Sequence, residues 1–279
     1  MHDVRLAVSA GFCFGVERAI KMAVSALHEL GSPVYTLGPI IHNPQEVERL
    51  QEMGLKMAQT LEEIPEGTVV IRSHGAPKGV IEEARQRGLE VIDATCPLVE
   101  RLTERVRELA EEGYQVVIVG ESDHPEVMAV LSYAPDSCYV VRGPEDCDRN
   151  ILKNDVGLVA QTTQSLVNLQ AVASLCISTC REVRTYNTIC QATHKRGSEA
   201  LQLAREVEVM IVVGGRNSAN TTRLAQAVAS GGTTTFHIES KEDLAGLEIP
   251  EGVSVGVTAG ASTPGWVIDE VVGALRKMD

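Results

Sequence analysis

The sequence predicts an α/β protein made of three similar modules, each with a mostly parallel sheet and flanking helices. Several runs rich in valine and isoleucine lack polar alternation, which is typical of strands buried on both faces of a parallel sheet. Three of these runs are each followed by a loop rich in Gly, Pro, Asn or Ser and then by an amphipathic stretch, at residues 68–88, 114–134 and 207–230. Each of these segments is typical of a strand–loop–helix unit.

Shorter apolar runs extend the same scheme. Further strands are expected within residues 89–95, 157–163 and 253–262. In open α/β sheets, ligands bind at the loops that follow the carboxyl ends of the strands. We therefore look for functional side chains in those loops.

Three cysteines occupy similar places in the chain. Cys13 follows a strand-like run, Cys96 follows the sequence VIDAT and Cys190 follows TYNTI, with spacings close to one module length. The predicted modules span residues 14–96, 97–189, and 190–279 together with 1–13.

Charge and hydropathy narrow the class of partner. The chain has 25 basic and 38 acidic side chains, a net charge of −13, which argues against a nucleic-acid partner. An anionic small molecule is still compatible, since backbone N–H groups, hydroxyls, amides and histidines can bind it. No apolar run approaches the roughly 20 residues of a membrane span, and the N-terminus lacks the pattern of an export signal. We expect a cytoplasmic protein with no membrane partner.

Seven cysteines in a chain without an export signal favour free thiols or cofactor ligands over disulfides. If the three module loops converge, Cys13, Cys96 and Cys190 supply thiolates for a soft metal or an iron–sulfur cluster. Zinc is an alternative, although no Cys-X-X-Cys pair is present. Each of the three is otherwise a small buried side chain, the interpretation we adopt for the four remaining cysteines: Cys138, Cys147, Cys176 and Cys180.

Two of the three phenylalanines of the chain, Phe12 and Phe14, flank Cys13. We expect their rings to shield a thiolate ligand from water, which would tune a cluster's potential. Packing in the core is the plainer alternative.

Three histidines lie in loops beside Pro, Gly or Asn: His42, His74 and His124. Histidine donates hydrogen bonds to phosphate and titrates near neutral pH. Glu126 follows His124 by two residues and is a candidate proton donor. The alternative for Glu126 is an ordinary glutamate in the first turn of a helix.

Hydroxyl and amide side chains mark other strand ends. Asn217, Ser218 and Asn220 stand where a helix should begin, an arrangement that suits a phosphate or diphosphate as well as a plain helix cap. Residues 161–165 (QTTQS) and 258–263 (TAGAST) repeat the hydroxyl pattern. Neither a dinucleotide-binding nor a P-loop glycine motif is present.

Together these stretches resemble the 4-hydroxy-3-methylbut-2-enyl diphosphate reductase family. The motifs that carry the resemblance, in order along residues 10–263, are AGFCFGVERAI, GPIIHNPQ, RSHGAP, DATCPLV, DHPEV, QTTQS, NTIC, GGRNSANTTRL and TAGAST. The resemblance implies three α/β modules arranged like a trefoil around a 4Fe-4S cluster. It implies Cys13, Cys96 and Cys190 as cluster ligands, with a fourth iron open to substrate or water.

The resemblance also implies roles for individual side chains. Glu126 is the expected proton donor, and Thr162 helps to position the substrate's hydroxyl end and its proton relay. The residues expected to bind the diphosphate are His42, His74, His124, Ser218, Asn220 and Ser262, and Thr162 completes the expected set of substrate-binding residues. The family often has a second serine where this chain has Ala219, so one hydroxyl donor of about 1 kcal/mol is missing.

The activity implied is the two-electron, two-proton removal of an allylic hydroxyl, which gives isopentenyl and dimethylallyl diphosphates and water. Because no flavin or nicotinamide motif is evident, the electrons should come from an external ferredoxin or flavodoxin. Two alternatives stay open. One is a non-redox iron–sulfur dehydratase of a phosphorylated substrate, and the other is a non-enzymatic, zinc-stabilised protein that binds a phosphate ligand.

Overall fold

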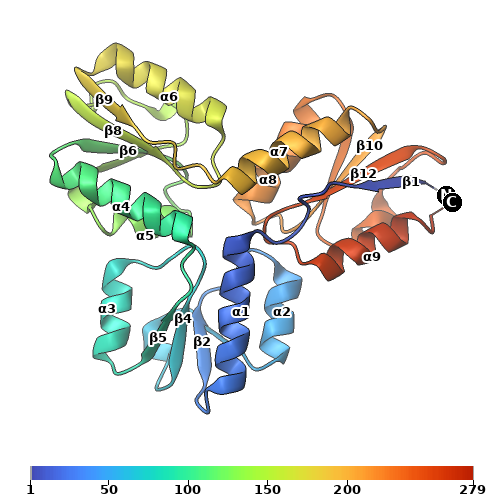
Figure 1. Ribbon diagram of the computed structural model, residues 1–279, viewed down its shortest axis with the longest axis horizontal. Coiled ribbons are helices and arrows are strands. Elements are labelled where there is room, and N and C mark those ends of the chain that lie inside the picture. Colours follow the sequence, from blue (N-terminus) through green and yellow to red (C-terminus); the bar gives the residue numbers. More distant parts are fainter. Residues whose placement is uncertain (1, 279) are drawn as a thin grey trace. The chain divides into compact units, whose positions relative to one another are not determined.

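The computed structural model describes residues 2–278, and within them the strands form three four-stranded sheets (Figure 1). Every strand pair in the three sheets is parallel. The predicted α/β class with three parallel sheets is therefore confirmed. The strands of each sheet fall inside one predicted module, while the module boundaries themselves stay a prediction.

The chain divides into two compact units. Unit 1 contains the residues up to Glu17, Ile41–Glu52, and the residues from Gln191 onward. Unit 2 contains Arg18–Ile40 and Met53–Cys190.

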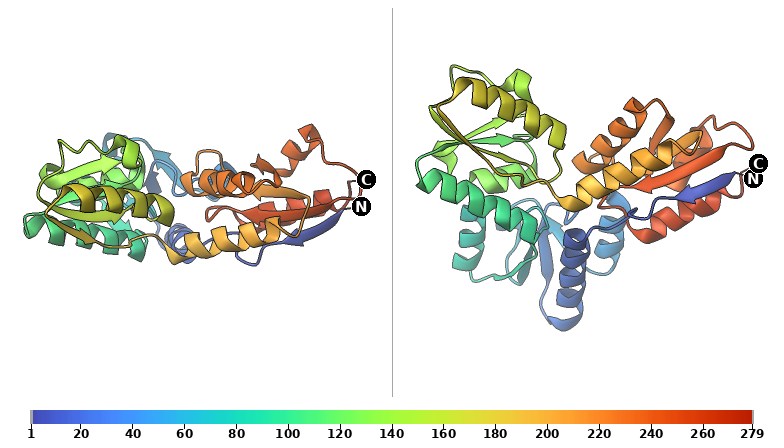
Figure 2. Two further views of the ribbon diagram at one scale, coloured as in Figure 1. Left: turned by 90° about the horizontal axis from the view of Figure 1, so that it is seen from above. Right: turned by 45° about the horizontal axis from the view of Figure 1, so that its top comes forward.

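One sheet belongs to unit 1, with the strand order β1-β12-β10-β11. Its strands are β1 (Asp3–Leu6), β10 (Val209–Val213), β11 (Thr234–Ile238) and β12 (Ser254–Ala259). Its helices are α2 (Pro44–Glu52), α7 (Gln191–Ala204), α8 (Ala219–Ser230), α9 (Gly265–Leu275) and the 3₁₀ turn η4 (Lys241–Gly246). Both views of Figure 2 show β1 beside the red and orange strands of the same sheet.

The continuous apolar run of β10 explains why this sheet is covered on both faces. Ile211 and Val213 pack with α9 and η4 in one core, while Met210 and Val212 pack with α7 and α8 in the other. All four side chains have no measurable exposure. A strand that alternated apolar with polar residues would leave one of these cores without its central side chains.

Unit 2 contains two sheets, with strand orders β3-β2-β4-β5 and β7-β6-β8-β9. The first comprises β2 (Val34–Leu37), β3 (Lys56–Ala58), β4 (Thr68–Ile71) and β5 (Glu90–Asp93). The second comprises β6 (Gln115–Val119), β7 (Cys138–Val141), β8 (Asp155–Ala160) and β9 (Glu182–Thr185). The helices and turns are α1 (Phe14–Glu29, whose first residues belong to unit 1), η1 (Leu61–Glu63), α3 (Lys78–Gln86), α4 (Pro97–Glu111), α5 (Pro125–Leu131), η2 (Pro135–Ser137), η3 (Pro144–Asp146) and α6 (Leu166–Thr179).

The strands predicted within residues 68–88, 89–95, 114–134, 157–163, 207–230 and 253–262 are present as β4, β5, β6, β8, β10 and β12. The strand-like run before Cys13 overlaps β1 only at Leu6, where this strand ends. The strands β2, β3, β7, β9 and β11 were not predicted. Four of these five are edge strands whose residues are largely exposed or half-buried. Polar residues interrupt the sequences of β3, β9 and β11, whereas β7 (CYVV) is a short apolar run that was missed in the sequence.

No helix within residues 2–278 combines the length and the apolar composition that crossing a bilayer requires.

Candidate active site

Each of the three predicted ligand cysteines stands immediately before a helix. Cys13 precedes α1, Cys96 is the N-cap of α4, and Cys190 precedes α7. All three side chains are partly exposed, and none forms a disulfide. The positive end of a helix dipole favours a thiolate, the form of cysteine that binds a metal.

Backbone hydrogen bonds hold two of these cysteines beside predicted site residues of unit 2. Cys96 N donates to Ser73 O at 3.0 Å, and Ser73 directly precedes His74. Cys190 N donates to Thr162 O at 2.8 Å. These contacts link each thiol-bearing turn to a loop in which we predict substrate contacts.

The same arrangement recurs in unit 1. Cys13 N donates to Ala261 O at 3.1 Å, and Ala261 directly precedes Ser262. This hydrogen bond joins Cys13, the residue before α1, to the loop after β12.

The other four cysteines occupy apolar surroundings. Cys138 packs against the core of α4 and α5, while Cys147, Cys176 and Cys180 lie in or against the core beneath α6. Burial raises the pKa of all four thiols, that of Cys138 to about 11 and that of Cys176 to about 12. These groups stay protonated near neutral pH and are poor candidates for metal ligands.

The expected shielding of Cys13 is wrong for Phe14. Phe14 is the first residue of α1, and its ring is 72% exposed. Phe12 is half-buried. A ring this exposed to solvent is not buried against Cys13, so Phe14 does not exclude water from this thiol.

Glu126 is held in a fixed orientation by Thr162 in unit 2. Its side chain is only 2% exposed and lies in the first turn of α5. Thr162 N donates to Glu126 Oε1 at 2.6 Å, and Thr162 Oγ1 donates to Oε2 at 2.7 Å. Both oxygens of one carboxylate are therefore bound by a single residue 36 positions further along the chain.

His124 is the N-cap of α5, and its Nδ1 accepts a hydrogen bond from Glu126 N at 3.1 Å. A neutral imidazole that accepts at Nδ1 carries its proton on Nε2, which can donate to an anion. The His124 ring also meets the His74 ring edge-on, with the centroids 5.5 Å apart. Unit 2 thus brings Glu126, Thr162, His124 and His74 together.

Unit 1 gathers four of the residues predicted to bind a diphosphate. Ser218 is the N-cap of α8, as the sequence predicted, and its Oγ lies 3.5 Å from Ser262 Oγ. Ser262 Oγ donates to His42 O at 3.1 Å. Asn220 Nδ2 is buried and has no hydrogen-bond partner within the described residues, so it is a donor available for a ligand.

Two glycines allow the loops around this cluster to approach closely. A Cβ at Gly260 would lie 1.9 Å from Thr221 Oγ1, and a Cβ at Gly215 would lie 2.7 Å from His42 O. Neither position has room for a side chain. The glycines of GGRN and TAGA are the local sequence signal for this tight packing.

Sequence reasoning missed the contacts that fix α2, which begins two residues after His42. Asn43 Oδ1 accepts a hydrogen bond from Glu46 N at 2.9 Å and caps the helix. The buried Glu46 carboxylate accepts from Arg49 at 2.6 Å and from Trp266 Nε1 at 3.1 Å. Contacts between residues 220 positions apart have no local sequence signal.

A family model described as LytB protein matches residues 4–276, nearly the whole chain. The chain belongs to the LytB protein family. The resemblance drawn from the motifs is therefore confirmed.

Among the curated relatives of this LytB chain are 4-hydroxy-3-methylbut-2-enyl diphosphate reductases from Pelobacter propionicus and Geobacter metallireducens. Each is 49% identical over 276 and 277 residues respectively, covering 99% of this chain and 98% of the relative.

Two solved structures have the same fold. One, of (E)-4-hydroxy-3-methyl-but-2-enyl diphosphate reductase, is 46% identical with a TM-score of 0.75 and full coverage of both chains. The other, the E-1-hydroxy-2-methyl-but-2-enyl-4-diphosphate reductase from Plasmodium falciparum, is 26% identical with a TM-score of 0.91 and covers 99% of this chain and 88% of that one.

Proposed function

We propose that this LytB chain removes the allylic hydroxyl of 4-hydroxy-3-methylbut-2-enyl diphosphate. The substrate takes up two electrons and two protons, the C–O bond breaks, and isopentenyl or dimethylallyl diphosphate forms together with water. The observation that carries the proposal is 49% identity over nearly the full length of relatives with this activity in their name.

The residues present fit an iron–sulfur cluster held by three thiolates. Cys13, Cys96 and Cys190 are partly exposed free thiols, and each stands at the N-terminus of a helix. The other four thiols lie in or against apolar cores, and burial raises their pKa. We assign these three residues as the ligands of a 4Fe-4S cluster. When bound, such a cluster supplies electrons and an open iron that polarises the substrate's hydroxyl oxygen. An external carrier of ferredoxin or flavodoxin type would deliver the electrons, since the sequence carries no flavin or nicotinamide motif.

Neutral hydrogen-bond donors would bind the diphosphate. The donors assigned are His124 Nε2, Asn220 Nδ2, the hydroxyls of Ser218 and Ser262, and the side chains of His42 and His74. Hydroxyls, amides and imidazoles bind an anion in a chain of net charge −13 without a cluster of lysines. Their role is to orient the substrate's hydroxyl end for reaction.

Glu126 would deliver a proton, and Thr162 would relay it. When Glu126 Oε2 is protonated, it can donate to Thr162 Oγ1, and the hydroxyl then turns its own hydrogen toward the departing oxygen. The second bond, from Thr162 N to Oε1, keeps the carboxyl group in place during this exchange. One hydroxyl rotation thus reverses the direction of the hydrogen bond without moving the backbone.

Anaerobic iron and sulfide analysis, combined with substrate turnover with and without a chemical reductant, tests the proposal. We expect about four irons and four sulfides per chain and loss of substrate only when the reductant is present. Turnover that ignores the reductant would identify a dehydratase. Zinc without sulfide, and no turnover, would identify a binding protein.

Substituting the proposed proton donor tests its role. Glu126→Gln keeps the shape of the side chain and its hydrogen bond from Thr162 N, but it cannot supply a proton. We expect turnover to fall by roughly 100-fold or more, with iron content unchanged. The exposed Glu104→Gln is the matched control and should retain full activity. Equal rates for the two variants would remove Glu126 from the mechanism.

A further inference from the structure

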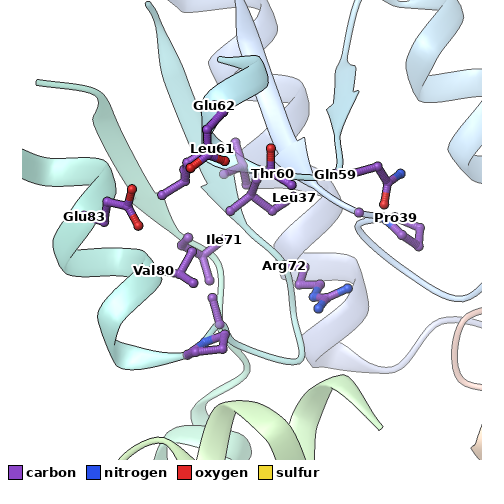
Figure 3. Close-up of a pocket in the computed structure, with 14 residues that line it drawn as sticks. Leu37, Pro39, Gln59, Thr60, Leu61, Glu62, Ile71, Arg72, Val80 and Glu83 are labelled. Carbon is purple, nitrogen blue, oxygen red and sulfur yellow. The ribbon is translucent and has the colours of Figure 1, made fainter. Parts of the chain in front are cut away.

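A cavity of about 430 Å³ lies in unit 2, at the carboxyl end of β2 and β4 (Figure 3). Its volume falls in the range of roughly 300–1,000 Å³ that small-molecule sites occupy. None of the residues assigned above to the cluster, the diphosphate or proton transfer lines it. Most of the lining is aliphatic, provided by Leu37, Pro39, Leu61, Val70, Ile71, Ala76, Pro77 and Val80.

Arg72, which directly follows β4, brings an unbalanced positive charge to this cavity. Its side chain is partly buried, and a Cβ at Gly38 would lie 3.1 Å from Arg72 Nη1. Within residues 2–278 no hydrogen bond or ion pair engages the Arg72 side chain. Burial lowers the pKa of this guanidinium, with no carboxylate to oppose the effect. A guanidinium removed from water without an anion costs free energy, and an anionic ligand would offset that cost.

The two carboxylates of the lining do not compensate Arg72. Glu62 and Glu83 bind Arg87, at 2.9 Å and 2.5 Å. Figure 3 shows them on the side of the cavity opposite to Arg72, which extends toward Pro39. Both carboxylates are also well exposed, so water screens them.

We propose that this cavity binds a small anionic amphiphile, a short aliphatic chain with a carboxylate or phosphate head. The head pairs with the Arg72 guanidinium, whose planar fork matches either group. The aliphatic body packs on Leu37, Leu61 and Val80, and removal of its surface from water supplies affinity.

Other classes of ligand fit this lining less well. A cation would meet the charge of Arg72, and an uncharged hydrocarbon would leave that charge without a partner. An aromatic base would find no aromatic side chain to stack on, because the lining contains none.

Calorimetric titration of the full-length, cluster-loaded protein tests the proposal, in a buffer free of carboxylate and phosphate. The probes are octanoate and hexyl phosphate, with acetate and 1-octanol as head-only and chain-only controls. We expect one site per chain for at least one of the two amphiphiles, and at least tenfold weaker binding of both controls. The preferred amphiphile identifies the head group. Acetate that binds as well as octanoate would indicate an adventitious ion only and would overturn the proposal.

Variants locate the site. Arg72→Met should weaken binding of the amphiphile by tenfold or more, and Val80→Phe, which fills the aliphatic part, should weaken it as well. Arg149→Met removes the same charge from an exposed position outside the cavity and should bind like the unmodified chain. Unchanged binding by Arg72→Met would overturn the proposal.

Thermal unfolding gives a second readout that does not depend on catalysis. Without ligand, Arg72→Met should unfold no earlier than the unmodified chain, because it loses an uncompensated charge. Excess amphiphile should raise the unfolding temperature of the unmodified chain only. A variant that unfolds markedly earlier without ligand would show that Arg72 is a structural residue and would overturn the proposal. Because Arg72 lies two residues before His74, turnover is not used as a readout, and failure of the reductase proposal would leave this test intact.

Discussion

Thr162 is the residue that joins most of the chemistry in unit 2. Its amide and hydroxyl bind the two oxygens of Glu126, and its carbonyl accepts from Cys190 N. Three of its polar groups are therefore directed at one proposed proton donor and one proposed cluster ligand. A serine offers the same groups, whereas a valine keeps the shape and lacks the hydroxyl.

Replacing the Thr162 hydroxyl should separate its relay role from its structural role. In Thr162→Val the bond to Glu126 Oε2 is lost while the bond from the amide N to Oε1 remains. We expect kcat to fall roughly 10- to 100-fold with KM changed less, and Thr162→Ser to stay within a few-fold of the unmodified enzyme. Steady-state kinetics with a chemical reductant measures both. Equal losses in the two variants would point to packing instead of proton transfer.

A buried thiol makes the stability of unit 2 depend on pH. Cys176 has no measurable exposure, and burial raises its pKa from 9.0 to about 12. Between pH 9 and 12 the unfolded chain loses this proton while the folded chain keeps it. The free energy of unfolding therefore falls as the pH rises through this window.

Cys176→Ala should reduce that dependence. Between pH 7.5 and pH 10 we expect the unmodified chain to lose about 1 kcal/mol more than the variant. Urea unfolding at the two pH values measures the change in the free energy of unfolding of each protein. The cavity created by the substitution lowers the stability of the variant equally at both pH values, so it does not affect this change. If the free energy of unfolding of the unmodified chain and of Cys176→Ala changed equally with pH, the Cys176 thiol would titrate like an exposed one.

At the level of elements, the short helix α2 is held by long-range contacts. Trp266, in α9, and Arg49 both bind the buried Glu46, and Gln45 Nε2 donates to Glu239 O at 2.9 Å. These bonds fasten the segment that follows His42 to the rest of unit 1. We infer that they help to fix the position of that histidine.

A matched pair of variants on α2 tests this anchoring. Glu46→Gln removes the charge that Arg49 and Trp266 bind, and we expect a loss of about 1–2 kcal/mol in the free energy of unfolding and a raised KM. Glu48→Gln, exposed on the same helix, should stay within about 0.5 kcal/mol. Chemical unfolding and substrate kinetics of both variants give the comparison. Equal free energies of unfolding and equal KM values for the two variants would mean that the contacts of Glu46 contribute neither to stability nor to substrate binding.

The predictability of each element depends on where its stabilising partners lie in the sequence. β10 was predictable because burial on both faces demands five consecutive apolar residues. β9 was not, because an edge strand with the exposed residues Glu182 and Arg184 has the composition of a loop. Its pairing with β8 is visible only in three dimensions.

The features of the candidate site also differ in whether the local sequence indicates them. The residue types and loops of His124, Glu126 and Ser218 could be predicted, since strand ends and helix caps have local signals. The pairing of Glu126 with Thr162 could not, nor could the exposure of Phe14. These features depend on contacts and orientations that the chain acquires only on folding.

On the scale of the whole molecule, the proposed cluster ligands are divided between the two units. Cys13 belongs to unit 1, whereas Cys96 and Cys190 belong to unit 2. If all three bind one cluster, the loss of any one of them should have the same effect, whichever unit contains it.

Single substitutions of the three cysteines should therefore have equal effects. Cys13→Ser, Cys96→Ser and Cys190→Ser should each lose most of the bound iron and all turnover, because two thiolates hold a cluster poorly. Cys138→Ser, a thiol in an apolar core, should keep its iron. Iron and sulfide analysis of anaerobically purified variants measures the effect. Full iron content in any of the first three would remove that residue from the ligand set.

The pairing of β1 with β12 sets an order of events during synthesis. Asp3 is aligned with Ser254, so the first strand of the chain can pair only after nearly all of the protein has left the ribosome. At roughly 5–20 residues per second, this segment and the neighbouring Cys13 wait roughly 10–50 s in an unfolded state. The thiol of Cys13 is thus among the last to be enclosed. If Cys13 binds the proposed cluster, iron would have to reach a finished chain, and this thiol would have to stay reduced until then.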